Sequence, residues 1–452
     1  MADHDRPARP RPTERLAAFF ALAALPVALT VLLVGAVLNW AALVTAVVAL
    51  LVGVTAGWHA VSRRGLRRAV AGLGTVLALA LLVAVAFIAD LSVARVALAI
   101  ALAALSAAAA RVALRRHGRP VAAARRPAAK PARPILLMNP KSGGGKVERF
   151  GLADECSRRG IEGVLLKPGE DLRELAEDAV ARGADAIGMA GGDGSQAIVA
   201  EVAARHGIPH VVVPTGTRNH LALDLGLDRN NVVGALDAFA DGVERRIDLA
   251  TVNGRVFVNN ASLGLYAHLV QSPEYRDAKL KTAAETLPDL LGPDAVPPDL
   301  RFAEPDGAPH FTAQLILVSN GPYQMDRLEG RGTREHMDSG TLGVVTLTIS
   351  DAAEALRFTT LQAAGQVRRF PGWRQWTAER FEVRSAGPVA IGVDGEALTI
   401  EPPLVFATLP RALRLRLPRH AVGVSPARRA VHLLSRSTLA GLVAVCLGRP
   451  AG

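Results

Sequence analysis

The stretch Ile135-Leu136-Leu137-Met138-Asn139-Pro140-Lys141-Ser142-Gly143-Gly144-Gly145-Lys146 decides the fold of the longer part of this chain. Its four apolar residues predict a short buried strand, its Pro- and Gly-rich half predicts a turn, and residues 147–160 have helical spacing. Consecutive glycines let backbone N–H groups surround a phosphate, and the following helix N-terminus adds positive potential. It is not a Walker A loop, because Pro140 and Val147 stand where that motif needs Gly and Ser or Thr. Taken alone, the stretch is equally compatible with a plain flexible turn.

Two further turns follow predicted strands. Residues 186–190 run into Gly191-Gly192-Asp193-Gly194-Ser195, and residues 210–213 run into Pro214-Thr215-Gly216-Thr217. Residues 161–166 predict another strand, and helical spacing separates the strands. This alternation predicts an α/β fold with a doubly wound parallel sheet, in which ligands bind at the carboxyl ends of the strands.

Each of these turns also has a purely structural interpretation. The segment around Asp193 can be a tight turn, although a carboxylate among three glycines is favourable mainly when it meets a cation or a metal ion. The last turn can cap a helix through Thr217 or Asn219. Three such turns at successive strand ends are much less expected by chance, so we predict one shared binding site.

The composition excludes several classes of protein. Half of the 452 residues are hydrophobic, which excludes a chain disordered throughout. The only cysteines, Cys156 and Cys446, cannot form a disulfide framework or a zinc cluster. Residues 1–134 hold 17 Lys and Arg against 4 Asp and Glu, whereas residues 135–452 hold 35 against 37. The larger part is therefore near neutral, and no nucleic-acid partner is expected.

Four apolar runs open the chain, at residues 16–38, 40–61, 69–89 and 91–112. Each reaches about 20 residues, the length that crosses the hydrocarbon core of a membrane. The alternatives are soluble core helices, which would show an amphipathic stripe, and a cleaved signal peptide, for which the first run is too long. We predict a four-helix transmembrane module over residues 1–114.

Arginine-rich and arginine-free flanks alternate around these runs. The N-terminal flank, the loop at 63–68 and the segment after residue 111 are rich in Arg, whereas the turns at Asn39 and Asp90 contain no cation. By the positive-inside rule, both termini and the large remainder of the chain lie in the cytoplasm. We therefore expect a multi-pass protein of the cell membrane.

The rest of the chain divides by composition. Pro residues among cations predict a stiff basic linker, which either holds the next domain at an anionic membrane surface, at about 1 kcal/mol per cation, or only fixes the topology. After residue 245 short β-type runs dominate, which predicts a β-sandwich-like lobe with helices near 272–291 and 352–364. An apolar run at 439–447 predicts an interfacial helix or a poorly ordered tail. The predicted parts are the module 1–114, the linker 115–133, an α/β lobe 134–245, a β-rich lobe 246–420 and a basic C-terminal tail 421–452.

The motifs together resemble the diacylglycerol kinase catalytic domain family, which includes sphingosine kinases and bacterial lipid kinases. The matching segments are Asn139–Gly145, Gly191–Ser195, Pro214–Leu221, Ile247-Asp248-Leu249, Val258–Gly264 and Val393-Asp394-Gly395-Glu396. The resemblance covers roughly residues 134–420 and leaves the four-helix module outside it.

This resemblance implies an ATP-dependent kinase that phosphorylates a lipid hydroxyl, with diacylglycerol as the first candidate. It implies a nucleotide-binding lobe like that of phosphofructokinase and NAD kinase, followed by a β-sandwich. Glu396 is the implied general base, Asp193 a second catalytic residue, and Asp193 with Asp338 the implied Mg²⁺ ligands. The implied nucleotide contacts are Asn139, Pro140, Lys141, Ser142, Gly143, Gly191, Gly192, Asp193, Gly194, Ser195, Gln196, Ala197 and Thr217.

The chain departs from the family pattern at two places. His220 replaces an acid after the third turn, and Asp224, one helical turn on, is a substitute suggested by position alone. Ser339 replaces an acid in the segment that usually holds Mg²⁺, with Asp338 beside it. These departures keep open a catalytically weak nucleotide-binding membrane regulator. A transporter or scaffold is disfavoured because the spans hold almost no charge. The expected partners are a membrane lipid substrate and an anionic membrane surface, with a homodimer left open.

The first prediction concerns topology. Reporter fusions at Arg64 and Arg126 should read cytoplasmic and a fusion at Asn39 should read external, because arginines flank only the first two positions. An external signal at Arg126 would overturn the orientation and would separate the larger part of the chain from cytoplasmic ATP.

Overall fold

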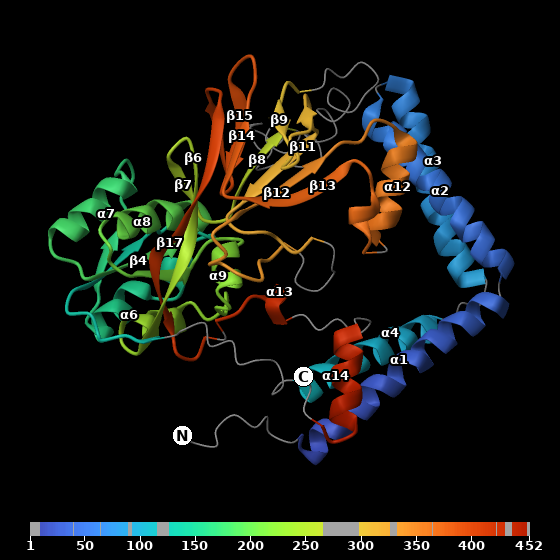
Figure 1. The fold of residues 1–452 in the computed structure, drawn as a ribbon, viewed down its shortest axis with the longest axis horizontal. Coiled ribbons are helices and arrows are strands. Elements are labelled where there is room, and N and C mark those ends of the chain that lie inside the picture. The colour runs from blue at the N-terminus through green and yellow to red at the C-terminus, as the bar shows by residue number, and fades with distance from the viewer. Residues whose placement is uncertain are drawn as a thin grey trace. The chain divides into compact units, whose positions relative to one another are not determined.

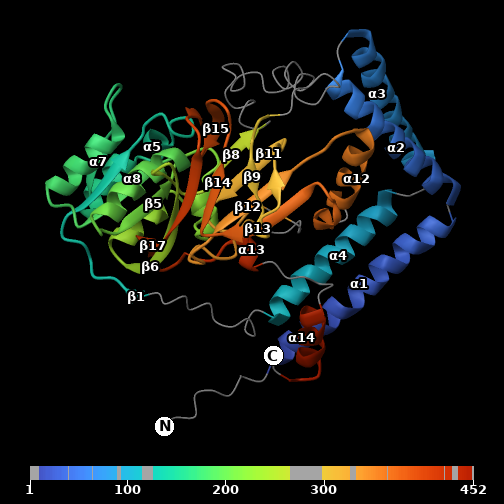
Figure 2. The same cartoon turned by 45° about the horizontal axis from the view of Figure 1, so that its top comes forward.

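The computed structural model describes residues 10–38, 40–63, 65–88, 93–114, 126–264, 298–325, 332–363, 365–421, 423–429 and 436–449. The chain forms two compact units, drawn from two sides in Figures 1 and 2. The helical unit comprises residues 1–122 and 430–452, and the sheet unit comprises residues 123–429.

The helical unit is built from long helices that pair side by side. They are α1 (Pro12–Leu38), α2 (Trp40–Ser62), α3 (Gly65–Ile88) and α4 (Val93–Leu114). Helix α1 packs along α4, and α2 packs along α3. Small residues bring α2 and α3 together, since a Cβ added to Gly53 would lie 3.2 Å from Ala78 Cβ. Such close approach of small residues is characteristic of helix pairs in membranes.

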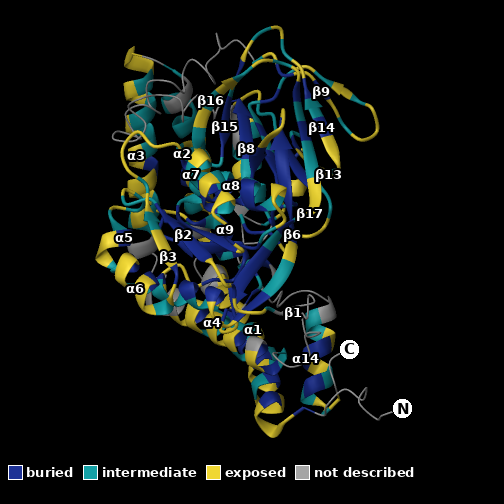
Figure 3. Ribbon diagram, turned by 90° about the vertical axis from the view of Figure 1, so that its left-hand side faces the viewer, coloured by how far each residue is buried: buried dark blue, intermediate teal, exposed yellow. Residues whose placement is uncertain are grey.

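Large apolar side chains cover the outside of these helices, and Figure 3 shows exposed residues along α1. Leu33 on α1 and Leu77 on α3 are each more than half exposed, an arrangement that suits contact with lipid. In the described part of the chain, three helices are long and apolar enough to cross a membrane, over Pro12–Val34, Trp40–Ala60 and Gly65–Val85. The apolar part of α4 is shorter, so a membrane anchor is indicated while the count of four spans stays a prediction.

The C-terminal end of the chain returns to the helical unit. Residues Arg436–Cys446 form helix α14, whose Leu442 and Val445 are buried against Ala18 of α1 and Ala110 of α4. The apolar run at 439–447 therefore folds as a packed helix, a partnership with α1 and α4 that the sequence did not indicate.

Four parallel strands form the centre of the sheet unit. They are β2 (Pro134–Met138), β3 (Glu162–Leu165), β4 (Ala186–Gly191) and β5 (His210–Pro214), in the order β5-β4-β2-β3. Every neighbouring pair is parallel. The strands predicted before the three turns are thus confirmed.

Helices cover both faces of this parallel sheet. Alternate residues of β2 divide between two cores, with Ile135 and Leu137 in one and Leu136 and Met138 in the other. The first core includes α7 (Leu172–Ala181) and α8 (Asp193–Arg205), and the second includes α6 (Leu152–Arg159) and the 3₁₀ helix η1 (Val233–Phe239). The helix predicted over 147–160 is broken, because Gly151 takes a φ of 55° between α5 (Lys146–Arg149) and α6.

Two long strands carry the sheet beyond the predicted lobe boundary. Strand β17 (Leu404–Pro418) pairs parallel with β5 at Leu415 and antiparallel along β6 (Gly242–Val252). Strands β7 (Arg255–Phe257) and β14 (Arg380–Val383) add to their far ends. Residue 245 therefore lies inside β6, and the two lobes share two strands.

Part of the predicted linker belongs to the sheet unit. Residues Arg126–Pro127 form the edge strand β1, which pairs with β6. The Asp185 carboxylate then accepts hydrogen bonds from the backbone N–H groups of Ala132 and Arg133. Residues 126–133 are therefore bound to the sheet, rather than spacing it from the helices.

The second lobe is a six-stranded antiparallel sheet facing the shared strands. Its strands are β13 (Trp373–Ala378), β12 (Leu342–Leu347), β11 (Leu315–Ser319), β8 (Asn260–Gly264), β15 (Val389–Val393) and β16 (Glu396–Ile400), in that order. Apolar residues of this sheet, such as Ile316 and Ile391, form one core with Phe257, Phe381 and Phe406. The predicted β-rich lobe is present.

The second lobe differs from the predicted pattern in detail. The chain passes from β7 to β8 at Val258–Asn259, so two strands follow each other closely there. The helix predicted near 352–364 is α12 (Ala352–Ala363). The helix predicted near 272–291 lies outside the described residues. Two short strands, β9 (Phe302–Ala303) and β10 (Pro309–His310), form a separate hairpin.

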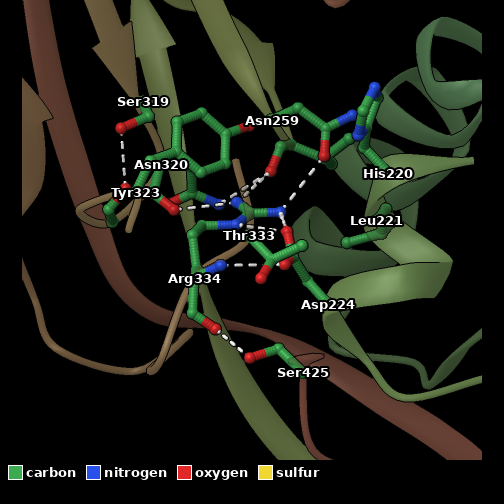
Figure 4. A network of polar contacts seen from close by, with 12 residues as sticks. His220, Leu221, Asp224, Asn259, Ser319, Asn320, Tyr323, Thr333, Arg334 and Ser425 are labelled. Carbon is green, nitrogen blue, oxygen red and sulfur yellow. Dashed lines mark hydrogen bonds and ion pairs between the residues drawn. The ribbon is translucent and has the colours of Figure 1, made fainter. Parts of the chain in front are cut away.

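A buried ion pair connects the two lobes. Arg334 and Asp224 are both almost fully buried, and Asp224 ends the short helix α9 (His220–Asp224) of the first lobe. The carboxylate of Asp224 accepts hydrogen bonds from Nε of Arg334 at 2.7 Å and from its backbone N–H at 2.9 Å. Figure 4 shows this pair at the centre of a wider polar network.

The remaining donors of Arg334 bind the second lobe. Its Nη1 donates to the carbonyl oxygens of Val258, at 2.7 Å, and Asn320, at 2.8 Å, and its Nη2 donates to Asn259 Oδ1 at 3.1 Å. The aromatic ring of Tyr323 lies 5.6 Å from the guanidinium carbon. The buried charge is therefore compensated from both lobes, which makes their separation costly.

We predict that Arg334→Met lowers the free energy of unfolding by about 3–5 kcal/mol, because it leaves Asp224 as an uncompensated buried charge. Urea unfolding of the detergent-solubilised chain, followed by tryptophan fluorescence, measures this. As a control, Arg182→Met removes exposed pairs with Glu162 and Asp178 and should cost less than about 1 kcal/mol. Equal losses in both variants would contradict a special role for the buried pair.

Candidate active site

The three predicted turns meet at one edge of the parallel sheet. Strands β2, β4 and β5 are neighbours and end together, with Met138 beside Ala190 and Gly191 beside Pro214. The Asn139 N–H donates to the Ala190 carbonyl at 3.0 Å, and the Gly216 N–H donates to the Gly191 carbonyl at 3.2 Å. The turns are thus bonded to one another by their backbones.

Two glycines are required by the close approach of these turns. A Cβ on Gly143 would lie 2.1 Å from the Thr215 carbonyl oxygen, and its φ of 56° also disfavours other residues. A Cβ on Gly216 would lie 2.5 Å from Gly192 Cα. The Lys146 ammonium, which donates to the Gly216 carbonyl at 3.0 Å, adds a positive charge between the first and third turns.

Backbone groups dominate the surface that this junction presents. Helix α8 starts at Asp193 with Gly192 as its N-cap, and no side chain caps its first N–H groups. The buried hydroxyl of Thr215 has no hydrogen-bond partner among the described residues. Free backbone donors at a helix N-terminus, close to flexible glycines, suit the phosphates of a nucleotide.

The carboxylate of Asp193 has partners that the sequence did not reveal. Its oxygens accept hydrogen bonds from the backbone N–H groups of His220, at 3.0 Å, and Leu221, at 3.1 Å. Asp193 therefore caps α9 from the second turn, since Asn219 directs its own amide to the Gly216 carbonyl instead. Backbone dipoles supply the compensation for which the sequence suggested a cation or metal ion.

The other predicted nucleotide contacts fall into two groups. Lys141 and Thr217 are exposed, while Asn139, Pro140 and Ser142 are half-buried in the first turn. By contrast, Gln196 and Ala197 are buried. The Gln196 amide donates to the Met189 carbonyl at 2.8 Å, and its oxygen lies 2.9 Å from His210 Nε2. This side chain therefore holds the start of α8 against strands β4 and β5.

Glu396, the predicted general base, lies directly against the second turn. A Cβ added to Gly194 would lie 2.7 Å from Glu396 Oε1. Glu396 Oε2 accepts a hydrogen bond from Arg255 Nη2 at 2.7 Å, and both side chains are about half exposed. Glu396 and Arg255 also line a cavity of about 170 Å³ together with Gly194, Ala197 and Asp394.

The hairpin turn before Glu396 explains this placement. Asp394 and Gly395 both have positive φ, 47° and 90°, as a two-residue type I′ turn requires, and Val393 pairs with Glu396 across it. Asp394 is therefore a turn residue rather than a strand residue. Its carboxylate accepts hydrogen bonds from the N–H groups of residues 258, 259 and 260 at 2.8–3.1 Å.

Asp394 has a strongly shifted acidity. Loss of solvation raises the pKa of Asp394 from 3.8 to about 7, and the negative charge of Asp193 acts in the same direction. The three backbone donors oppose this increase in pKa but do not cancel it. Asp394 and Asp193 thus interact electrostatically, which links the hairpin turn to the second glycine turn.

The described residues contain no preformed metal centre. Within the described ranges, no cluster of three or more His, Cys, Asp or Glu residues could hold a metal ion. Asp193 caps α9, and Asp338 is exposed beside Gly340, whose N–H donates to Asp248 at 2.6 Å. The role of Asp193 and Asp338 as Mg²⁺ ligands therefore stays a prediction, and no step is assigned to such an ion.

Asp224 does not replace the acid lost at His220. Its carboxylate is buried and paired with Arg334 at the C-terminal end of α9. Sequence reasoning also missed Arg255, which directly follows the Asn253-Gly254 turn between β6 and β7. Asn-Gly is a hairpin signal, so its position in a hairpin was predictable, but nothing local indicates its contact with Glu396.

Comparison with known proteins agrees with this geometry. Residues 133–252 match the sequence profile of the family described as "Diacylglycerol kinase catalytic domain". The protein named diacylglycerol kinase from Bacillus subtilis (strain 168) is 28% identical over 232 residues, which cover 50% of this chain and 76% of the relative. The one from Mycobacterium tuberculosis (strain ATCC 25618 / H37Rv) is 36% identical over 120 residues, 26% of this chain and 39% of the relative.

A solved structure has the same fold. A crystal structure of a Bacillus anthracis str. Sterne chain assigned to the diacylglycerol kinases superposes with a TM-score of 0.51 at 19% identity, over 65% of this chain and 98% of that one. Residues 133–252 are thus similar in sequence to the diacylglycerol kinase catalytic domain family, and the fold agrees with that similarity.

We predict that the shifted acidity of Asp394 is visible in stability. An acid with a raised folded-state pKa stabilises the fold fully below its ordinary pKa, and this contribution is lost as the pH rises through the folded-state pKa. Between pH 5 and pH 7, the unfolding free energy should therefore fall relative to that of Asp394→Asn, by up to about 1.4 kcal/mol per pH unit. Urea unfolding of the two proteins at a series of pH values measures this difference. If the unfolding free energies of both proteins changed equally with pH, the pKa of Asp394 would be unshifted and the prediction would be wrong.

Proposed function

We propose that this protein is a membrane-anchored kinase that transfers the γ-phosphate of ATP to the hydroxyl group of a lipid, with diacylglycerol as the first substrate to test. The observation that carries the proposal is the contact of Glu396 with Gly194, because it puts an acid of the second lobe beside the glycine turns of the first. Phosphoryl transfer needs both parts, a cradle for phosphates and a carboxylate near the acceptor hydroxyl.

The three turns are the proposed nucleotide site. Backbone N–H groups at the start of α8 and in the Gly143–Gly145 turn would bind phosphate oxygens, and Lys146 would add a positive charge. Magnesium would arrive with ATP as part of the nucleotide substrate and neutralise phosphate charge. Asp193 would act indirectly, by holding the start of α9 against the second turn.

Glu396 is the proposed proton acceptor. The lipid hydroxyl loses its proton to the Glu396 carboxylate as its oxygen bonds to the γ-phosphorus, and the bond from that phosphorus to ADP breaks. Arg255 would hold the carboxylate in place through its 2.7 Å hydrogen bond. Asp394 is the nearest competitor for this role, but its carboxylate is already bound by three N–H groups of the chain.

The helical unit would confine the enzyme to the surface that contains its substrate. Anchoring raises the effective concentration of a lipid substrate without any new contact. We propose four spans with both termini and the sheet unit on the cytoplasmic side, as the arginine distribution predicts. The anionic membrane surface would be a further partner of the basic segments that flank the spans.

A catalytically weak nucleotide-binding regulator is the second candidate. One observation favours it: the Arg334 pair removes Asp224 as a replacement for the acid absent at His220. Such a protein would bind ATP without phosphorylating any lipid.

The test is incubation of the full chain in lipid vesicles with γ-labelled ATP and diacylglycerol, followed by identification of the labelled lipid. Glu396→Gln keeps the shape of the side chain and removes the base, so kcat should fall by about 10²–10⁴-fold with little change in the KM for ATP. Glu401→Gln, an exposed acid just beyond β16, is the matched control and should be unaffected.

Three outcomes separate the candidates. Labelled lipid with loss in Glu396→Gln supports the kinase and its base. Labelled lipid with near-normal turnover in Glu396→Gln but loss in Asp394→Asn would exchange the two roles. ATP binding without labelling of any lipid in a mixed extract would favour the regulator.

A further inference from the structure

The α2–α3 hairpin of the helical unit contains a groove that no step of the proposed reaction uses. It has a volume of about 850 Å³ and runs between the last turns of α2 and the first turns of α3. This volume is within the range of pockets that bind small-molecule ligands and cofactors.

The body of the groove is apolar and hollow. Leu51 and Val52 of α2 and Val70 of α3 form its sides, and each is about half exposed. Its lining also includes Ala56 and Gly74, where a Cβ added to the glycine would lie 3.5 Å from Ala56 Cβ. These small residues bring the helix backbones together while leaving the space beside them unfilled, which suits a flexible hydrocarbon chain.

One end of the groove is cationic. His59 lies in the last turn of α2 and Arg63 directly follows this helix, where its N–H donates to the His59 carbonyl at 3.1 Å. Arg67 lies in the first turn of α3. None of the described residues that line the groove is acidic. Two guanidinium groups at the mouth of an apolar groove complement a phosphate attached to hydrocarbon chains, and Arg pairs with phosphate through two parallel hydrogen bonds.

We propose that this groove binds one anionic phospholipid, with its acyl chains against Leu51, Val52 and Val70 and its phosphate at Arg63 and Arg67. Neutral apolar ligands would leave the cations without a partner at the membrane surface. A free phosphate would leave the apolar groove empty. The site goes beyond the proposed kinase function, since it concerns a bound lipid in the anchor and holds whichever lipid is phosphorylated.

The test is native mass spectrometry of the full chain released from nanodiscs that contain equal amounts of phosphatidylglycerol and phosphatidylcholine. One retained phosphatidylglycerol per chain is expected. Arg63→Gln and Arg67→Gln should each reduce the preference for phosphatidylglycerol about fivefold, the factor for one cation near a lipid surface. Arg68→Gln removes the same charge from the next residue, which does not line the groove, and should change the preference less than twofold.

Two more variants keep the result interpretable. Arg67→Lys should retain most of the preference, which a misfolded variant would not. Ala71→Phe places a bulky ring in the groove without changing charge and should reduce retention of both lipids, with the helical circular dichroism unchanged. Equal loss in Arg67→Gln and Arg68→Gln would mean diffuse charge attraction and overturn the site. Retention of phosphatidylcholine equal to phosphatidylglycerol, or lipid-free dimers of the chain, would overturn it as well.

Discussion

The ion pair between Arg334 and Asp224 is the contact on which the arrangement of the two lobes depends. Asp224 ends α9, and the start of the same short helix is held by Asp193 of the second turn. On the other side, Arg334 binds the carbonyl of Val258, whose N–H is held by Asp394 next to Glu396. The buried guanidinium of Arg334 thus connects, through a chain of polar contacts, the second glycine turn with the hairpin that carries Glu396. Because Arg334 and Asp224 are both withdrawn from water, loss of either one leaves the other uncompensated.

The local part of this structure was predictable from sequence, and the long-range part was not. The three turns could be placed at one sheet edge because the ends of parallel neighbouring strands must meet, and Glu396 could be placed in a hairpin because Asp-Gly is a turn signal. No local pattern indicates that Asp193 caps α9, that Arg334 pairs with Asp224, or that Arg255 binds Glu396, since these partners are 27 to 141 residues apart. The extension of β17 to Pro418 is visible in the sequence, because Leu413, Leu415 and Leu417 alternate with arginines as in a β-strand.

The candidate nucleotide site is built mostly from backbone groups and glycines. Gly143 and Gly216 are required because a Cβ added to either would lie only 2.1 or 2.5 Å from a backbone atom of a neighbouring turn. By contrast, the position of His220 contributes a backbone N–H to Asp193, which any residue except proline supplies. The glycine-set geometry of the turns is therefore compatible with a histidine at position 220.

The return of α14 to the helical unit has a consequence for the order of biosynthesis. The ribosome makes α1 first and α14 last, and the whole sheet unit is translated between them. The alanine surface of α1 and α4 that receives Leu442 and Val445 is therefore incomplete until the sheet unit has left the ribosome. A nascent chain that stalls or is truncated within the sheet unit carries an anchor with an uncovered docking face. The packing of the helical unit can therefore be completed only after the sheet unit has been translated.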